Sequence, residues 1–191
     1  MNFVTGLIAL FVSVQAFAGL GEDFRDLKDS GINYEITGAV CEEVLRLRYQ
    51  EEFPANKYSV VTGIEYGDGS RTVGELDVIV FESNSQKVVR VGEIKCWKDN
   101  RSALNKAQSQ RKRFLTYLAS GKQVFFKSLH SSYKWNKSHF ANFKEMVTVA
   151  PRGSKADGFD AELSYELSEL MKLRQMLVEC QNNGQCKSST H

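Results

Sequence analysis

The chain has 191 residues, of which 42% are hydrophobic and 25% are charged, and it contains no internal repeat or low-complexity tract. These values lie in the globular range, and the length suits one well-packed core but is short for two. The formal net charge of +2 at pH 7 does not identify a partner, because binding of a polyanion depends on where the charges lie.

The first eighteen residues predict a secretory signal peptide. They contain no charged side chain, are apolar from Phe3 to Val14, and end in the small-x-small pattern AFA at residues 16–18. The apolar run is too short to span a bilayer comfortably, although no Lys or Arg precedes it. We therefore expect a secreted or periplasmic protein without stable membrane insertion after cleavage, and residues 19–191 are expected to form a single domain. A retained anchor, or an intracellular protein with an uncleaved Met1, is the alternative.

The first half of the mature chain predicts helices followed by three strands. Residues Glu22–Asn33 suit a short helix or an ordered lead-in, and Thr37–Glu52 has apolar residues at helical spacing. Three β-like runs follow at Tyr58–Tyr66, Gly74–Phe81 and Lys87–Trp97, separated by the turn-forming sequences GDGS and ESNSQ. Such short connections favour hairpins or a meander.

The second half predicts a helix, a strand and a less regular end. Ser102–Ala119 carries an apolar face and is followed by Gly121, whereas the stretch Gln123–Leu129 is rich in Val and Phe. A fifth strand is expected around Met146–Val149, then a loop, then an amphipathic helix over Ala161–Glu179. This order predicts an α/β fold with a mixed central sheet flanked by helices, plus a C-terminal helix.

The four cysteines suit an oxidising compartment, because they are even in number and form no CxxC pair. Of the three possible connectivities, we expect Cys180 with Cys186, closing a small loop, and Cys41 with Cys96. Four buried or free thiols are the alternative.

Two adjacent predicted strands carry acids and a lysine. Side chains alternate along a strand, so Glu93 and Lys95 project to the same side, and Asp77 in the preceding strand can bring a second carboxylate beside Glu93. Two converging carboxylates repel each other unless a cation shares them, and oxygen ligands suit Mg²⁺ or Mn²⁺. Such an ion polarises a phosphoryl oxygen and acidifies a bound water. A structural ion-pair cluster is the alternative.

These residues resemble the motif of the PD-(D/E)xK nuclease superfamily, an acid on one strand and (D/E)-x-K on the next, here Asp77 and Glu93-Ile94-Lys95. The resemblance implies a restriction-endonuclease-like core of order αβββαβ. It also implies that Asp77, Glu93 and the Ile94 carbonyl bind Mg²⁺ or Mn²⁺, and that Lys95 assists the attacking water. The residue before Asp77 is Leu76, where many members have Pro.

The resemblance also implies a metal-binding Glu on the first helix and a substrate-binding Gln on the second. Glu42 and Glu43 are both placed for the first role, and helical phase favours Glu43, which lies at the edge of the apolar face. Gln108 and Gln110 flank the apolar stripe of the second helix equally, so spacing does not choose between them. Arg111 joins them as a candidate substrate contact.

The segment from residue 95 to residue 137 is strongly basic, with eleven Lys or Arg against the single acid Asp99. Trp97, Tyr117, Tyr133 and Trp135 are interleaved with these cations and could stack on bases while the cations meet phosphates. No zinc-like His spacing, GxSxG motif or Gly-rich phosphate loop is present. We therefore expect an exported, metal-dependent nuclease acting on nucleic acid, DNA more than RNA. An exported nucleic-acid-binding module on an inactive nuclease scaffold is the alternative.

Overall fold

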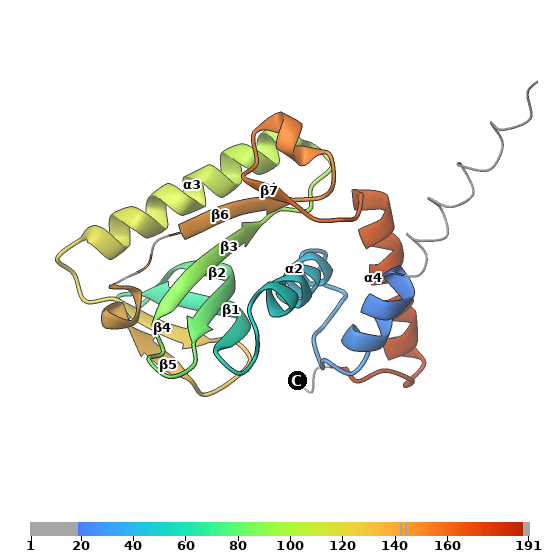
Figure 1. The fold of residues 1–191 in the computed structure, drawn as a ribbon, viewed down its shortest axis with the longest axis horizontal. Helices are drawn as coiled ribbons and strands as arrows, with labels where there is room; N and C mark the ends of the chain where they lie inside the picture. The colour runs from blue at the N-terminus through green and yellow to red at the C-terminus, as the bar shows by residue number, and fades with distance from the viewer. Residues whose placement is uncertain (1–18, 142, 144, 189–191) are drawn as a thin grey trace, which may run out of the picture. The chain divides into compact units, whose positions relative to one another are not determined.

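The computed structural model describes residues 19–141, 143 and 145–188, and the chain divides into two compact units (Figure 1). The core unit comprises residues 41–166, and the terminal unit combines the chain up to residue 40 with the chain from residue 167. The expected signal peptide lies outside the described residues, and the expectation of a single domain stays a prediction. Within the described part, no helix is long and apolar enough to cross a membrane.

The core unit is built on one mixed sheet of seven strands, which confirms the predicted α/β class. Their order across the sheet is β5-β4-β1-β2-β3-β6-β7. The pairs β3–β6 and β6–β7 are parallel, and the other neighbours are antiparallel. The strands are β1 (Tyr58–Gly67), β2 (Thr72–Glu82), β3 (Val88–Ile94), β4 (Phe125–Ser128), β5 (Lys134–Asn136), β6 (Glu145–Ala150) and β7 (Ala161–Glu162).

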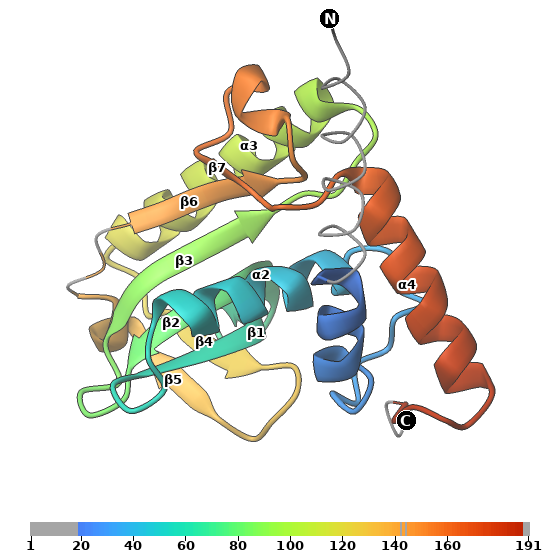
Figure 2. The same cartoon turned by 45° about the vertical axis from the view of Figure 1, so that its right-hand side comes forward.

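Two helices cover opposite faces of this sheet (Figures 1 and 2). Helix α2 (Ala39–Glu52) approaches Gly92 so closely that a Cβ there would lie 2.8 Å from Leu45 Cδ2. Helix α3 (Asn100–Ala119) lies against β3 and β6 on the other face, where its Phe114 belongs to the same core cluster as Val91. Because side chains alternate along a strand, Gly92 faces α2 whereas Val91 faces α3.

The strand that pairs with β3 after α3 is β6, and not β4, which is the first strand after the helix. The predicted strand over Gln123–Leu129 forms as β4, but it pairs with β1, on the far side of the sheet from β3. The short segments β4, β5 and the 3₁₀ helix η1 (Lys137–Phe140) intervene before β6 pairs in parallel with β3. Residue composition indicates that a segment forms a strand but not which strand it pairs with. The sequence therefore predicted β4 and β6 as strands but not their partners in the sheet.

Several predicted boundaries were wrong at the C-terminal end of the core unit. The amphipathic helix was expected from Ala161, but helix α4 covers Leu167–Asn182. Ala161 instead pairs with Val149 as part of β7, because the sheet edge at β6 offers unpaired backbone groups. The predicted loop before it contains a 3₁₀ helix, η2 (Ser154–Asp157).

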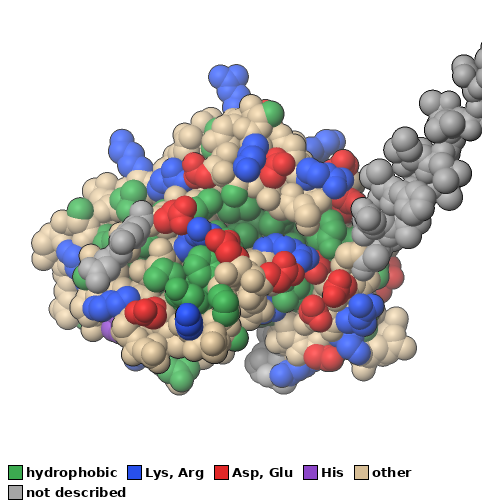
Figure 3. Space-filling view, in the orientation of Figure 1, with side chains coloured by type: hydrophobic (Ala, Val, Ile, Leu, Met, Phe, Trp, Pro, Cys, Tyr) green, Lys and Arg blue, Asp and Glu red, His purple; other side chains and the backbone are tan. Residues whose placement is uncertain are grey.

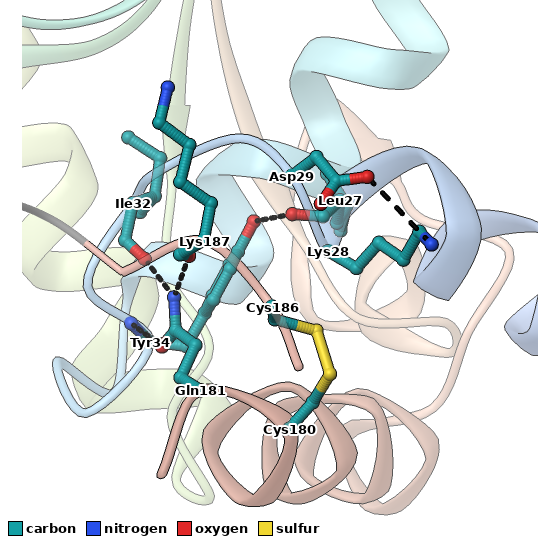
Figure 4. The surroundings of a disulfide bond; sticks show 9 residues. All are labelled: Leu27, Lys28, Asp29, Ile32, Tyr34, Cys180, Gln181, Cys186 and Lys187. Carbon is teal, nitrogen blue, oxygen red and sulfur yellow. Dashed lines mark hydrogen bonds and ion pairs between the residues drawn. A yellow bond between two sulfur atoms is a disulfide. The ribbon is translucent and has the colours of Figure 1, made fainter. Parts of the chain in front are cut away.

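The terminal unit is tied together by a disulfide and by one glutamine (Figure 4). Cys180, near the end of α4, is bonded to Cys186, as predicted. The side-chain amide of Gln181 donates to the carbonyls of Ile32 (2.7 Å) and Lys187 (2.8 Å). Residues 19–27 are helical, so a helix does form in the predicted lead-in, although it begins before Glu22. The described part of the chain therefore contains four α-helices.

Candidate active site

Asp77 and Glu93 lie opposite each other on adjacent strands. The antiparallel register pairs Val78 of β2 with Gly92 of β3, and its continuation by one residue sets Asp77 opposite Glu93. The backbone N–H of Ile94 donates to Oδ2 of Asp77 at 2.8 Å. An aspartate side chain therefore accepts the hydrogen bond of a strand N–H at the end of β3, which fixes its carboxylate between the two strands.

Lys95 joins the two carboxylates. Its Nζ lies 2.5 Å from Oε1 of Glu93 and 3.1 Å from Oδ2 of Asp77, and it donates to the Ile94 carbonyl at 2.9 Å. The Lys95 backbone N–H donates to the carbonyl of Val149 in β6 at 3.0 Å. The predicted trio of Asp77, Glu93 and Lys95 is thus brought together, and the backbone of Lys95 is held by a strand that is far away in sequence.

The cluster has more carboxyl groups than cations, and both carboxyl groups are buried. Glu93 is fully buried, and no donor among the described residues makes a hydrogen bond of good geometry to either of its carboxylate oxygens. Burial, and then the charge of Asp77, raises the pKa of Glu93 to about 8. Burial also raises the pKa of Asp77, although Lys95 and the Ile94 N–H oppose it. One ammonium is therefore shared by two carboxylates, which favours uptake of a proton or a cation.

The pKa of Lys95 is raised despite its burial. Burial favours the neutral amine, but the charges of Asp77 and Glu93 outweigh it. Lys95 therefore remains an ammonium at neutral pH, so it can stabilise negative charge or orient a water but cannot act as a base there.

The two candidate glutamates of the first helix lie in different surroundings. Glu43 is buried, accepts a hydrogen bond from Thr62 Oγ1 at 3.0 Å, and pairs with Arg46 Nε at 2.7 Å. Glu42 is half-buried, and its pKa is raised to about 8 by burial, with further contributions from the charges of Asp77 and Glu75. The predicted Glu43 is therefore paired with Thr62 and Arg46, whereas Glu42 is close enough to Asp77 for their charges to interact.

Glu75 is a neighbour of the cluster that the motif does not include. Its pKa is raised by burial and by the charges of Asp77 and Glu65. Glu75 and Asp77 are two residues apart in β2, the spacing at which side chains share a face. That alternation in the sequence GELDV was the signal that could have found it.

A disulfide connects the two chain segments that supply the cluster. Cys41, immediately before Glu42, is bonded to Cys96, immediately after Lys95. Both predicted pairings are therefore present and all four cysteines are bonded. The covalent bond restrains the start of α2 relative to the end of β3.

The chain matches no protein-family model, no curated protein and no solved structure. The chemistry of the site has to follow from its residues. Within the described residues, no three His, Cys, Asp or Glu side chains come close enough together to form a metal cage. A metal ion at Asp77 and Glu93 would therefore have to complete its coordination with backbone carbonyls and water, as Mg²⁺ usually does.

The predicted substrate contacts on α3 differ in their surroundings. Gln108 is exposed, whereas Gln110 is half-buried and its Oε1 has no hydrogen-bond partner among the described residues. Arg111 forms an ion pair with Asp160, which accepts hydrogen bonds from the Thr148 N–H and Oγ1, both at 2.8 Å. Within the described residues, no hydrogen bond or ion pair links these three side chains to the Asp77–Glu93 pair, so their role stays a prediction.

The basic segment is spread over the core unit. Lys106, Lys112 and Arg113 are exposed on α3, whereas Lys127 pairs with Glu65 at 2.7 Å. Figure 3 shows Lys and Arg side chains alternating with Asp and Glu side chains across the middle of the face that it presents. On that face the charges are mixed.

The interleaved aromatic residues also differ in exposure. Tyr133 is 70% and Trp97 44% exposed, but Trp135 is only 8% exposed and stacks on Phe81. Trp135 therefore belongs to the core, and sequence composition could not separate it from its exposed neighbours.

Proposed function

We propose that this chain is an exported, divalent-metal-dependent phosphodiesterase that hydrolyses nucleic acid, with the architecture of the PD-(D/E)xK superfamily. The observation that carries the proposal is the trio of buried Asp77, buried Glu93 and half-buried Lys95 on two adjacent strands, with more carboxylates than cations. The element order α2-β1-β2-β3-α3, completed by β6 in parallel with β3, supports it because the superfamily core has the order αβββαβ.

The donor set fits Mg²⁺ or Mn²⁺. Oε1 of buried Glu93 faces the Lys95 ammonium, whereas its buried Oε2 has no hydrogen-bond partner among the described residues, which is where a hard cation would supply one. Asp77, Glu93 and the Ile94 carbonyl would hold the ion with water completing its coordination, and Glu42 is the helix carboxylate whose pKa the charge of Asp77 raises. When bound, such an ion supplies polarisation of the phosphoryl oxygen and a more acidic water.

The remaining chemistry comes from the chain itself. Lys95 is held as an ammonium by two carboxylates, so it can place a donor on the attacking water or on the oxygen where negative charge develops. The buried strand ends keep bulk water from screening these charges. The eleven basic residues between positions 95 and 137 favour a polyanionic substrate, and DNA is the first one to test.

A nucleic-acid-binding module on an inactive scaffold is the second candidate, and one observation favours it. Lys95 already contacts Glu93, Asp77 and the Ile94 carbonyl, which is the arrangement of a self-contained ion-pair cluster. Such a cluster compensates its buried charges without an ion.

A cleavage assay separates the two candidates. Purified protein is incubated with plasmid, linear and single-stranded DNA and with RNA, in Mg²⁺ or Mn²⁺ and in EDTA. We expect metal-dependent cleavage, and Lys95→Ala should slow it by about 10²–10⁴-fold, whereas Lys57→Ala, at an exposed lysine outside the basic segment, should cleave normally. Intact nucleic acid under all conditions, or a Lys95→Ala variant equal to wild type, would reject the enzyme and leave the binding module.

Export is tested separately by the intact mass of protein from the native host. We expect a mature chain beginning at Gly19 with both disulfides formed. A mass that includes Met1 and four reduced cysteines would instead support an intracellular nuclease.

A further inference from the structure

A hollow of about 440 Å³ lies beside the tip of the β1–β2 hairpin. One wall is the hairpin itself, and the other is the β4–β5 pair, which contributes Phe125, Lys127 and Lys134. Its volume falls within the range of about 300–1,000 Å³ that is usual for small-molecule sites. None of the residues of the trio described above lines it.

A glycine of the hairpin turn lies against the Phe125 ring. Gly69, in the hairpin turn, has φ +90°, and a Cβ there would lie 3.1 Å from Cε2 of Phe125. The turn is fixed by Asp68, whose Oδ1 accepts hydrogen bonds from the backbone N–H groups of Ser70 (2.9 Å) and Arg71 (3.0 Å). A residue with a side chain at position 69 would press on the phenyl ring. As the chain stands, Phe125 is 44% exposed.

Cations surround the exposed ring. Arg71 and Lys134 both line the hollow; the Arg71 side chain is 79% exposed, and its Nε lies 3.5 Å from Oδ2 of Asp68. Lys134 is exposed as well, whereas Lys127 is already paired with Glu65. An aromatic face with flexible cations at its rim is the combination that binds a nucleobase and its phosphates.

The hollow is close to the acidic cluster along the sheet. Glu65, in the wall of the hollow, is paired in register with Glu75 of β2, and Glu75 is two residues from Asp77. Two residues along a strand correspond to about 7 Å, and neighbouring strands are about 5 Å apart. A single strand a few nucleotides long can therefore reach both places.

We propose that this hollow is a base-binding subsite, in which an unpaired nucleobase of the substrate stacks on Phe125 while its phosphates contact Lys134 and Arg71. The subsite rests on the proposed function for its substrate class. It favours single-stranded or locally unpaired nucleic acid, because a base inside a duplex cannot enter a side pocket without leaving its stack.

Equilibrium binding tests the subsite without requiring turnover. The full chain is titrated in EDTA against fluorescein-labelled (dT)12 and against the same oligonucleotide with abasic positions, and fluorescence anisotropy gives the dissociation constants. We expect Phe125→Ala to bind (dT)12 about 5- to 100-fold more weakly than wild type does. Phe125→Trp should restore the affinity, and the abasic oligonucleotide should bind wild type and Phe125→Ala equally.

Leu129→Ala is the matched control, because Leu129 is 48% exposed and lies outside the hollow. It should bind like wild type, and melting temperatures show that each variant folds. Equal binding of (dT)12 by Phe125→Ala and wild type, or an equal loss in Leu129→Ala, would overturn the subsite. If wild type cleaves nucleic acid and Phe125→Ala binds (dT)12 normally, the subsite is rejected and the proposed function stands. If wild type cleaves nothing and Phe125→Ala binds (dT)12 weakly, the subsite stands and the enzymatic function is rejected.

Discussion

Replacing Glu42 with Gln should stabilise the metal-free protein at pH 8 and leave its stability nearly unchanged at pH 4.5. In the folded chain the pKa of Glu42 is raised from 4.5 to about 8 by burial, Asp77 and Glu75. A raised carboxyl pKa means that the folded state holds a proton that the unfolded state has lost. Stability therefore falls as pH rises from about 4.5 to about 8, and it changes no further above that. Gln carries no charge, so the variant escapes this loss.

The size of the effect follows from the two pKa values. A full difference from 4.5 to about 8 would correspond to about 5 kcal/mol at pH 8, but Glu42 is half-buried and partly screened, so we expect about 2–3 kcal/mol. That gain corresponds to a rise in melting temperature of roughly 5–10 °C for a chain of this size. Glu93, whose pKa is also raised, contributes equally to wild type and variant, so the difference between them isolates Glu42.

Urea unfolding in EDTA at pH 4.5, 6, 7 and 8 measures the difference directly. Glu43→Gln is the matched control, because Glu43 receives a hydrogen bond from Thr62 and an ion pair from Arg46. That variant should lose about 1–3 kcal/mol at pH 8, a change of opposite sign. A Glu42→Gln variant that is no more stable than wild type at pH 8, or that gains as much at pH 4.5, would refute this electrostatic reasoning.

Three further predictions concern the disulfides, the sheet and the metal. Serine at both Cys41 and Cys96, which close a separation of 55 residues, should cost about 4 kcal/mol in urea unfolding; serine at Cys180 and Cys186, separated by 6, should cost about 2. Equal losses would contradict the loop-length argument. Gly92→Ala should cost about 1–3 kcal/mol because its Cβ would meet two side chains of α2, and unchanged stability would show that α2 can shift. Mn²⁺ binding at pH 7 should release about one proton, seen by calorimetry as a binding enthalpy that depends on the buffer; identical enthalpies in all buffers would contradict it.

The local structure could be predicted because it is encoded locally. Periodic apolar residues in Thr37–Glu52 and Ser102–Ala119 and turn sequences between the β-like runs indicated α2, α3 and the β1–β2–β3 meander. Pairing between distant strands could not be predicted, because β3 and β6 are separated in the sequence by a helix and a hairpin. The predicted start of the C-terminal helix was wrong for the same reason, because residues 161–162 pair with the edge strand β6 instead of joining the helix.

The candidate site divides in a similar way. Alternation along one strand was enough to place Glu93 and Lys95 together, and the adjacent hairpin brought in Asp77. The choice between Glu42 and Glu43 depended on helical phase, which measures distance from the apolar face but not which strand end the helix approaches. Arg46, one turn along the same helix, and Thr62 of β1 supply partners for Glu43, and the contact with Thr62 is not visible in the helix sequence.

The bond between Cys41 and Cys96 links assembly of the charged cluster to the place where the chain folds. It forms between the neighbours of Glu42 and Lys95, so covalent restraint of those two residues depends on oxidation. In a reducing cytoplasm thiols stay reduced, and a newly made chain would hold α2 and the end of β3 together by packing alone. If the protein is exported as proposed, this covalent restraint beside the charged cluster forms only after the chain has left the reducing compartment.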